Sequence, residues 1–252
     1  MRSESWIGLL GLLAASSLAG AAEPAPAPPD PRAVSRGKVV YQRFCASCHG
    51  VRGDGRGPSA PWIDPPPRDF TGGIYEWRST PSGTLPRDED IARTITHGLH
   101  LTPMPSWRGL VEDQIDDLVA YLEHFSPRFA SEPRGAALEI PPEPPASRES
   151  VARGQKLYLT ACAPCHGSAG RGDGESAKWP GLSDEWGHHV QPRDLTAGPF
   201  GSGEANRDIY RVLMTGVDGT PMPSYAAAFT AAQGWDVVHY IQTLRDRSAD
   251  ER

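Results

Sequence analysis

The stretch FCASCHG, residues 44–50, holds two cysteines separated by two residues and followed directly by a histidine. The same arrangement returns as ACAPCHG, residues 161–167, and the two motifs contain all four cysteines of the 252-residue chain. Cysteines at this spacing indicate a disulfide or redox pair, half of a zinc site, or covalent attachment of haem. The adjoining histidine distinguishes among these three alternatives.

Covalent haem attachment explains every residue of the motif, because two thiols add to the haem vinyl groups and the next side chain reaches the iron. A zinc site would have to bring together two cysteine pairs 117 residues apart, and both histidines would remain unexplained. A thioredoxin-like pair expects a βαβ setting, which the sequence lacks. We therefore predict two covalently bound haem c groups. The attaching residues are Cys45, Cys48, Cys162 and Cys165, and the proximal iron ligands are His49 and His166.

The two halves of the chain match beyond these motifs. Aligning the cysteines brings RGDGRG onto RGDGES, PPRDFT onto QPRDLT, and LTPMPSW onto GTPMPSY. Self-similarity at one long period indicates a tandem duplication. The chain is therefore expected to fold as two similar domains, each with its own core.

Two of the four methionines occupy matching positions in the repeat. Met104 and Met222 each lie in a Thr-Pro-Met-Pro-Ser segment, where the flanking prolines restrict the loop. A thioether opposite histidine stabilises reduced iron and raises its potential, which suits electron transfer. We predict that both are distal iron ligands; the alternative is that they fill gaps in the two cores.

Each copy is expected to be mostly helical, because apolar residues recur at helical intervals and no strand alternation of useful length occurs. Acidic starts and glycine stops bound the central helices, and Thr230 with Gln233 has the spacing of a capping box. The predicted class is all-α. The expected helices cover residues 34–45, 88–98 and 111–125 in the first copy and 151–162, 206–216 and 231–244 in the second.

The first 22 residues have the pattern of a secretory signal peptide. Arg2 precedes an apolar run that ends in Ala-Gly-Ala-Ala before a Pro-rich stretch. The run is shorter than the roughly 20 apolar residues that usually span a bilayer, and an uncleaved anchor is the alternative. We predict export to the periplasm, with no integral membrane segment in the mature chain. A formal net charge of -6 argues against a basic nucleic-acid-binding surface.

On these motifs, each half resembles a class I cytochrome c domain, and the tandem resembles the diheme periplasmic cytochromes c. The resemblance covers nearly all of the mature chain and implies domains at residues 32–126 and 149–247, with a Pro-rich linker at 127–148. It also implies that the first helix of each domain packs on the last. The implied contacts join Gly37 and Tyr41 with Tyr121, and Gly154 and Tyr158 with Tyr240.

Arginine and tryptophan residues supply further candidates for haem contact. Arg68 and Arg193 lie in the matching Pro-Arg-Asp segments, where a guanidinium is able to bind a haem propionate through two hydrogen bonds. The alternative is that each pairs with its neighbouring Asp or fixes a turn. Large apolar groups exclude water, so four tryptophans are expected to wall the haem crevices. They are Trp62, Trp77, Trp107 and Trp179.

The resemblance implies an electron-transfer protein rather than an enzyme. Its two His/Met-ligated haems would carry single electrons between redox partner proteins in respiratory or dehydrogenase systems. The donor would be a dehydrogenase or complex, and the acceptor an oxidase or reductase. Two alternatives stay open: a peroxidase-like diheme enzyme with one open iron, and a cytochrome subunit of a larger oxidoreductase complex.

Overall fold

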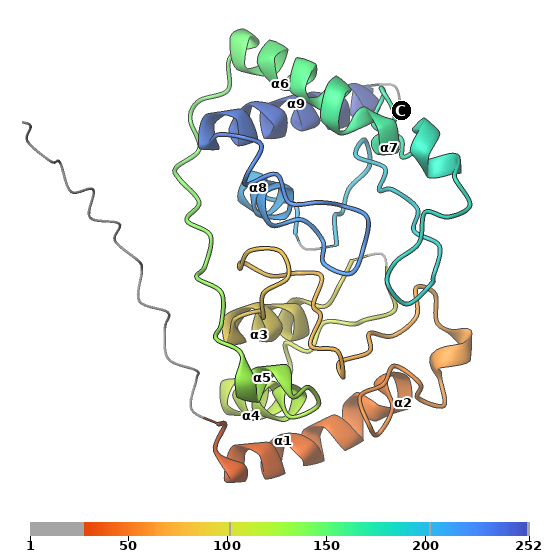
Figure 1. Ribbon diagram of the computed structural model, residues 1–252, viewed down its shortest axis with the longest axis vertical. Helices are drawn as coiled ribbons and strands as arrows, with labels where there is room; N and C mark the ends of the chain where they lie inside the picture. The colour runs from red at the N-terminus through yellow and green to blue at the C-terminus, as the bar shows by residue number, and fades with distance from the viewer. Residues whose placement is uncertain (1–27, 101, 202, 251–252) are drawn as a thin grey trace, which may run out of the picture.

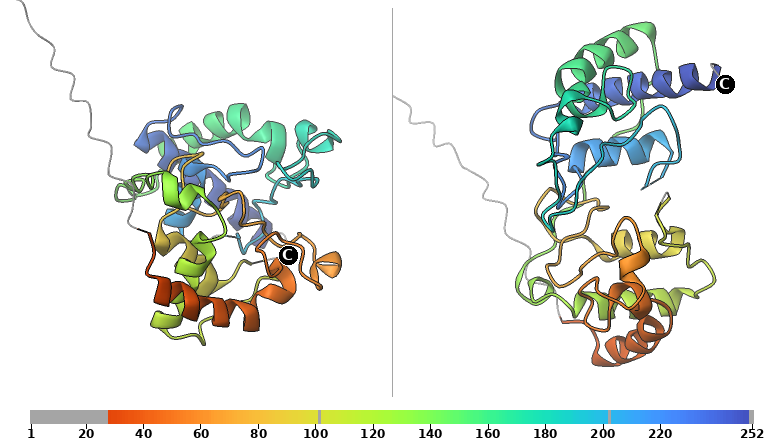
Figure 2. Two further views of the ribbon diagram at one scale, coloured as in Figure 1. Left: turned by 60° about the horizontal axis from the view of Figure 1, so that its bottom comes forward. Right: turned by 90° about the vertical axis from the view of Figure 1, so that its right-hand side faces the viewer.

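A computed structural model describes residues 28–100, 102–201 and 203–250, with side chains described up to residue 246. The predicted signal peptide, residues 1–22, lies outside the described residues. Within these ranges the protein is helical, and its only β-type pairs are isolated bridges such as Asp54 with Asp69. The all-α prediction is confirmed. Figure 1 shows two stacked helical bodies, domain 1 below and domain 2 above, and the same division is visible in the two views of Figure 2.

Domain 1 begins with a long helix whose start is specified locally. The side chain of Asp30 accepts a hydrogen bond of 2.9 Å from the backbone N–H of Arg32, and proline occupies the first helical position. The helices of this domain are α1 (Pro31–Phe44), α2 (Ala46–His49), α3 (Asp88–His97) and α4 (Glu112–Glu123), with a short 3₁₀ helix η1 (Ala60–Trp62); α5 (Arg128–Ser131) follows in the segment between the domains.

Domain 2 repeats this order. Ser147 caps its first helix by accepting from the backbone N–H of Ser150 at 3.1 Å. Thr230 and Gln233 form the predicted capping box, with reciprocal hydrogen bonds of 2.8 and 3.3 Å. The helices are α6 (Arg148–Ala161), α7 (Ala163–His166), α8 (Asn206–Thr215) and α9 (Ala231–Asp250), with a 3₁₀ helix η2 (Glu175–Lys178).

In both domains the first helix crosses the last at a glycine. A Cβ atom added to Gly37 would lie 1.9 Å from the carbonyl oxygen of Asp117, and one added to Gly154 would lie 1.9 Å from that of Asp236. Only glycine permits this approach of two backbones. The predicted crossings α1–α4 and α6–α9 are therefore confirmed.

Aromatic side chains fill these crossings. The rings of Tyr41 and Tyr121 lie 5.2 Å apart, and those of Tyr158 and Tyr240 lie 5.1 Å apart. Tyr41 and Tyr158 are completely buried. Edge-on and tilted aromatic pairs at this spacing add to the stabilisation from burial.

The segment between the domains differs from the expected Pro-rich linker. It contains helix α5, and Phe129 of that helix is buried in the core of domain 1. Beyond α5 the chain is extended, and Leu138 and Ile140 pack against the core of domain 2. Residues 127–148 thus act as a strap that contacts both domains, and it is the green segment along one side in Figure 1.

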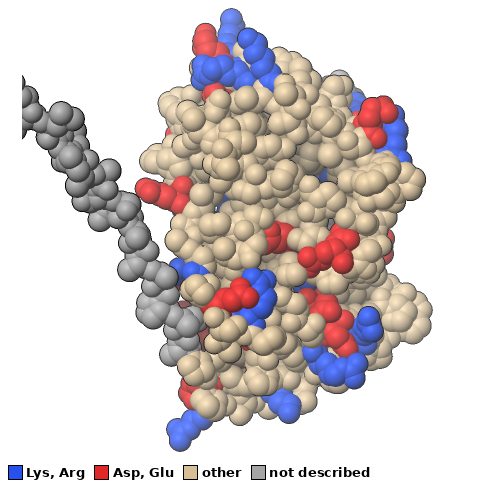
Figure 3. Space-filling view, in the orientation of Figure 1, with Lys and Arg blue, Asp and Glu red and all other residues tan. Residues whose placement is uncertain are grey.

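A buried ion pair joins the two domains. Arg78 has no exposed side-chain surface, and its guanidinium lies 2.7 Å from the carboxylate of Asp218. It also donates to the carbonyl oxygen of Thr215 at 2.9 Å. Asp218 accepts two further hydrogen bonds from domain 1, from Ser82 and Gly83. Acidic side chains gather at the level where the domains meet, whereas most of the visible face of domain 2 is uncharged (Figure 3).

No helix among the described residues is both long enough and apolar enough to cross a bilayer.

Candidate functional site

The Cys-x-x-Cys-His motif occupies a single helical turn in each domain. In domain 1, Cys45 follows α1, and its carbonyl oxygen accepts from the backbone N–H of His49 at 2.9 Å. The corresponding bond from His166 to Cys162 is also 2.9 Å. One turn therefore carries both thiols and the histidine, which is the arrangement that attachment to one haem edge requires.

A buried tyrosine holds the end of each motif. The Tyr41 hydroxyl donates to the carbonyl oxygen of Gly50 at 2.7 Å, and the Tyr158 hydroxyl donates to that of Gly167 at 2.8 Å. Gly50 has a φ of 78° and Gly167 a φ of 77°, values that other residues adopt with strain. The turn after each histidine is thus stabilised both by the backbone conformation of its glycine and by the hydrogen bond from the buried tyrosine.

Backbone carbonyl groups orient both histidines. Nδ1 of His49 lies 3.0 Å from the carbonyl oxygen of Arg68, and Nδ1 of His166 lies 2.8 Å from that of Arg193. Because a carbonyl oxygen only accepts, Nδ1 carries the proton and Nε2 keeps its lone pair. Burial lowers the pKa of both histidines, which favours neutral imidazoles. Each histidine is therefore ready to ligate a metal through Nε2.

The first thiol of each motif is at least partly buried, Cys45 half-buried and Cys162 buried. Burial is the main cause that raises the pKa of Cys45 to about 11 and that of Cys162 to about 12. All four cysteines are free thiols in this structure. They remain available for thioether bonds rather than being used in disulfides.

A cavity of about 1100 Å³ contains the motif of domain 2. Its wall includes Cys162, Cys165, His166 and Met222, so the attachment residues and the predicted distal methionine face one space. Apolar residues such as Phe200 and Leu213 complete the wall, as a haem pocket requires. These residues fit a covalently attached haem group.

Domain 1 contributes to the same cavity. Arg68, Glu76, Trp77, Leu99 and Thr102 line it, whereas the motif residues of domain 1 and Met104 are not part of its wall. The cavity of domain 2 therefore opens onto the loops of domain 1 that follow its own cysteine motif.

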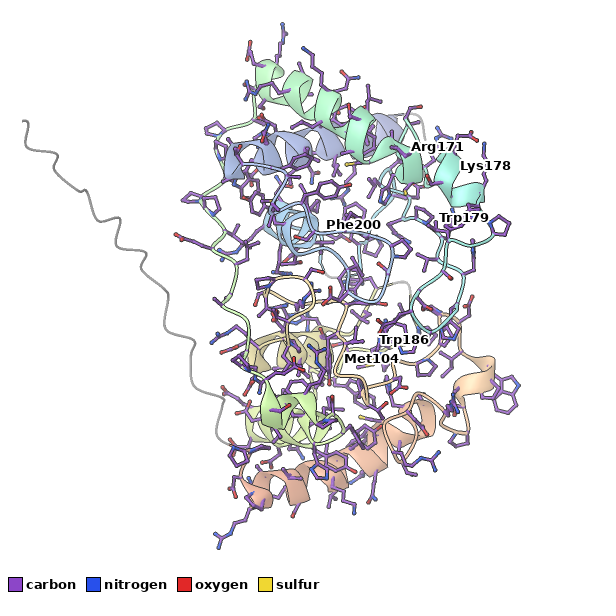
Figure 4. All side chains as sticks on the ribbon, viewed as in Figure 1. Met104, Arg171, Lys178, Trp179, Trp186 and Phe200 are labelled. Carbon is purple, nitrogen blue, oxygen red and sulfur yellow. The ribbon has the colours of Figure 1, made fainter. Side chains whose placement is uncertain are left out.

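The two methionine loops have the same local structure. The backbone N–H of Met104 donates to the Thr102 hydroxyl at 3.1 Å, and that of Met222 donates to the Thr220 hydroxyl at 3.2 Å. Met104 is labelled in Figure 4, within domain 1. Both side chains are half-buried. The matching loops are consistent with a common role, and iron ligation by these methionines remains a prediction.

The two Pro-Arg-Asp arginines make different contacts. Arg68 forms an ion pair with Glu76, and its guanidinium lies over the ring of Trp186 in domain 2, 3.9 Å from the centroid. Arg193 donates from Nη2 to the carbonyl oxygen of Pro199 at 3.0 Å. Neither forms an ion pair with the adjacent aspartate in this structure; Asp69 and Asp194 each accept from the threonine two residues later. Propionate binding by both arginines remains a prediction.

The tryptophan prediction is wrong for two of the four residues. The side chains of Trp62 and Trp179 are 83% and 63% exposed, so they do not wall a crevice. Trp62 is the last residue of η1 and Trp179 directly follows η2, so both lie at the end of aligned 3₁₀ segments. Trp77 does line the cavity, and Trp107 packs against Phe44 with ring centroids 5.3 Å apart.

Three further residues became visible only in the three-dimensional structure. Arg78 and Asp218 meet across the domain boundary. Trp186 of domain 2 contacts Arg68 of domain 1, and Figure 4 places Trp186 near the boundary between the domains. Burial raises the pKa of the Glu76 carboxyl group against the opposing effect of Arg68. The sequence around Arg78, YEWRSTPSG at residues 75–83, does not identify a partner for it.

Comparison with protein families gives one match in each half of the chain. Residues 32–122 match the family model described as cytochrome c oxidase, cbb3-type, subunit III. Residues 151–245 match the model described as cytochrome c. Each match includes one Cys-x-x-Cys-His motif, and together they support two covalently bound haem c groups.

Among solved structures, the chain is similar to one from the reducing HAO-like protein complex of Kuenenia stuttgartiensis. The two are 38% identical, the alignment covers 83% of this chain and 95% of that chain, and the TM-score is 0.80. A second match is cytochrome CL from the marine methylotrophic bacterium Methylophaga aminisulfidivorans, at 15% identity and a TM-score of 0.26. It covers 44% of this chain and 81% of that chain, and a TM-score this low supports no structural argument.

Proposed function

Because this chain belongs to the cytochrome c family, with one family domain in each half, we propose that it carries single electrons between redox partners through His/Met-ligated haems. Haem c supplies the one-electron chemistry when bound. The protein holds each proximal imidazole in one tautomer, excludes water with a packed core and limits movement around the site. These are the properties that a rapid change of oxidation state requires.

One observation carries the proposal. Met222 lines the same cavity as Cys162, Cys165 and His166, so a sixth ligand is available to an iron held by His166. The Met104 loop has the same hydrogen bonds as the Met222 loop, which supports a matching role in domain 1. An iron with two protein ligands has no vacant position for substrate, which disfavours the peroxidase-like alternative.

The proposed ligation can be tested with carbon monoxide. The visible spectrum of the dithionite-reduced protein is recorded before and after the gas is added. Unchanged c-type bands mean that strong sixth ligands close both irons. A shift in part of the spectrum means that one methionine assignment is wrong and favours an enzyme.

Matched variants identify the ligand in each domain. Met104→His and Met222→His should each lower one midpoint potential and leave the other nearly unchanged, because imidazole favours oxidised iron relative to thioether. The controls are Met104→Leu and Met222→Leu, which should each make one iron reactive toward carbon monoxide. A methionine whose replacements leave both potentials and the gas reaction unchanged is not a ligand.

A second candidate is a cytochrome subunit of a larger oxidoreductase complex. It is favoured by the similarity to one chain of a protein complex, because the match covers 95% of that chain. Sedimentation of the protein from its native source distinguishes a free electron carrier from a subunit of a complex. A species near the 27.2 kDa of the full chain supports a free carrier, and a much larger species that contains other proteins supports a subunit.

The proposed location is the periplasm. Members of the cytochrome c family typically work there or outside the cell, and the sequence pattern of residues 1–22 predicts export. Mass spectrometry of the mature N-terminus would show whether the segment is removed. A mature chain that begins at Met1 would favour an uncleaved anchor.

A further inference from the structure

Two buried N–H groups in the cavity of domain 2 have no hydrogen-bond acceptor among the described residues. They are Nε1 of Trp77 and Nε of Arg193, and both side chains line this cavity. A buried donor without an acceptor costs free energy, so such groups are rare unless a ligand or an ordered water satisfies them. Two of them in one cavity indicate a ligand that accepts hydrogen bonds.

The two donors come from different domains. Trp77 belongs to domain 1, yet it reaches domain 2, because a Cβ added to Gly201 would lie 2.9 Å from its indole ring. Arg193 belongs to domain 2, and its own carbonyl oxygen orients His166. The equivalent segment of domain 2, GPFGSG at residues 198–203, is shorter than its counterpart and contains no tryptophan. The two copies therefore do not share this indole.

The attached haem of domain 2 supplies acceptors of the required kind. Its propionates are carboxylates, each with several lone pairs, and they form strong hydrogen bonds with arginine and indole N–H groups. Arg68 also lines the cavity, but its guanidinium is already paired with Glu76 and stacked on Trp186. Trp77 and Arg193 are thus donors that remain open to the group attached at Cys162 and Cys165.

We propose that Trp77 of domain 1 donates its Nε1–H to a propionate of the haem attached in domain 2, with Arg193 as the second donor. The haem site of domain 2 is therefore completed by a residue of domain 1. The inference rests on haem attachment in domain 2 and is independent of the role proposed for Met222. It also implies that the bound haem strengthens the contact between the domains, since a ligand held by both stabilises their association.

The test uses the full chain with both haems attached, in a Cys162→Ser background. The haem of domain 2 then keeps one vinyl group in conjugation with the ring, so its α band moves to longer wavelength and is followed separately in a redox titration. Trp77→Phe removes the N–H and keeps an aromatic ring. Trp107→Phe is the matched control, because Trp107 is a domain 1 residue packed on Phe44.

At a pH where the propionates are ionised, Trp77→Phe should lower the midpoint potential of the domain 2 haem and leave that of the domain 1 haem unchanged. Loss of the donor leaves more negative charge on the carboxylate, which favours oxidised iron. Haem labelled with ¹³C at the propionates provides a direct readout, because one carboxylate band in the redox difference infrared spectrum should shift. Trp107→Phe should change neither the band nor the domain 2 potential.

Two outcomes overturn the inference. If Trp77→Phe moves only the domain 1 potential, the indole serves the haem of its own domain. If it moves neither the potentials nor the carboxylate band, water satisfies the buried N–H. Failure of the proposed methionine ligation is a separate result, because it appears as carbon monoxide binding in the protein with native Trp77.

Discussion

The two domains are nearly identical around their cysteine motifs and differ at two aligned positions, the first residue of α3 or α8 and one residue of α4 or α9. The bond from histidine to the Arg carbonyl is 3.0 Å in domain 1 and 2.8 Å in domain 2. By contrast, the acids Asp88 and Glu123 of domain 1 align with the amides Asn206 and Gln242 of domain 2. Contacts that shape the site recur in both copies, whereas residues outside it differ in charge.

The substituted pairs also bind different parts of the strap. Arg134 forms ion pairs with Asp88 at 3.1 Å and with Glu123 at 2.5 Å. In domain 2, Asn206 instead donates to Glu143 at 2.6 Å and accepts from Gln242 at 2.5 Å. The strap thus supplies a cation to the acidic pair and a carboxylate to the amide pair. Each domain has a distinct electrostatic link to the same segment.

Breaking the contact between the domains should have the largest effect. Asp218→Ala leaves Arg78 buried without its carboxylate partner, which should destabilise the docked protein by about 3–5 kcal/mol. Calorimetry should then show two separate unfolding transitions, one for each domain. Glu175→Gln is the control, since its pair with Lys178 is exposed and should contribute less than about 1 kcal/mol. Unchanged unfolding of Asp218→Ala would mean that other contacts hold the domains together.

Closing the helix crossings tests the similarity of the two cores. Gly37→Ala and Gly154→Ala should each destabilise their own domain by about 1–3 kcal/mol, because the new methyl group overlaps a backbone carbonyl on the last helix. Chemical denaturation followed at the haem bands measures both variants. Gly109→Ala is the control, because nothing lies within 4 Å of a Cβ there. If the two variants lose very different amounts of unfolding free energy, the packing around the two crossings differs despite the matching geometry.

The acid-to-amide difference should appear as a pH dependence confined to domain 1. Burial, assisted by Asp88, raises the pKa of Glu123 to about 7 despite the opposing effect of Arg134. The folded state then binds the proton more tightly than the unfolded state, whose ordinary pKa is lower. Stability contributed by the protonated form is present at low pH and is lost as pH rises toward about 7, on the order of 2 kcal/mol.

Glu123→Gln gives domain 1 the amide found in domain 2. The free energy of unfolding, measured from about pH 4.5 to 7, should lose most of its slope in this variant. Gln242→Glu is the reverse change and should introduce a slope in domain 2. A slope that persists in Glu123→Gln would assign the titration to another group.

The smallest effect is expected at the stack of Arg68 on Trp186. A double-mutant cycle of Arg68→Gln and Trp186→Leu should give a coupling of about 0.5–1 kcal/mol, because the contact is a single cation–π pair. Trp186 lies in the longer loop of domain 2, which has no counterpart in domain 1. Zero coupling would mean that this added loop does not contribute to docking.

Local patterns predicted the helices and the cysteine motifs well. The helix expected at residues 206–216 is α8 (Asn206–Thr215), and the one expected at 88–98 is α3 (Asp88–His97). Acidic starts, glycine stops and apolar spacing act within a few residues, so the sequence contains the relevant information. The packing of α1 on α4 was also accessible, because the resemblance to class I cytochrome c domains implies it for Gly37, Tyr41 and Tyr121.

Contacts between distant segments were not accessible. Arg78 and Asp218 are 140 residues apart, and no spacing rule connects them. The prolines of the strap predicted a linker, but the burial of Phe129 and the docking of Leu138 depend on surfaces that exist only after both domains fold. The prediction that Trp62 walls a haem crevice was wrong for a related reason. The apolar character of a tryptophan does not show in which direction the backbone points its side chain.

The crossing of the first helix on the last has a consequence for how the chain is made. Synthesis proceeds from the N-terminus, so Cys45 and Cys48 emerge long before α4 exists to cover α1. In folded domain 1, where Tyr121 packs on Tyr41, Cys45 and Cys48 are half-buried. Every residue of the first site precedes domain 2 in the chain, so domain 1 can be completed before α9 has been made. The order of the helices along the chain thus sets the order in which the two sites can be completed.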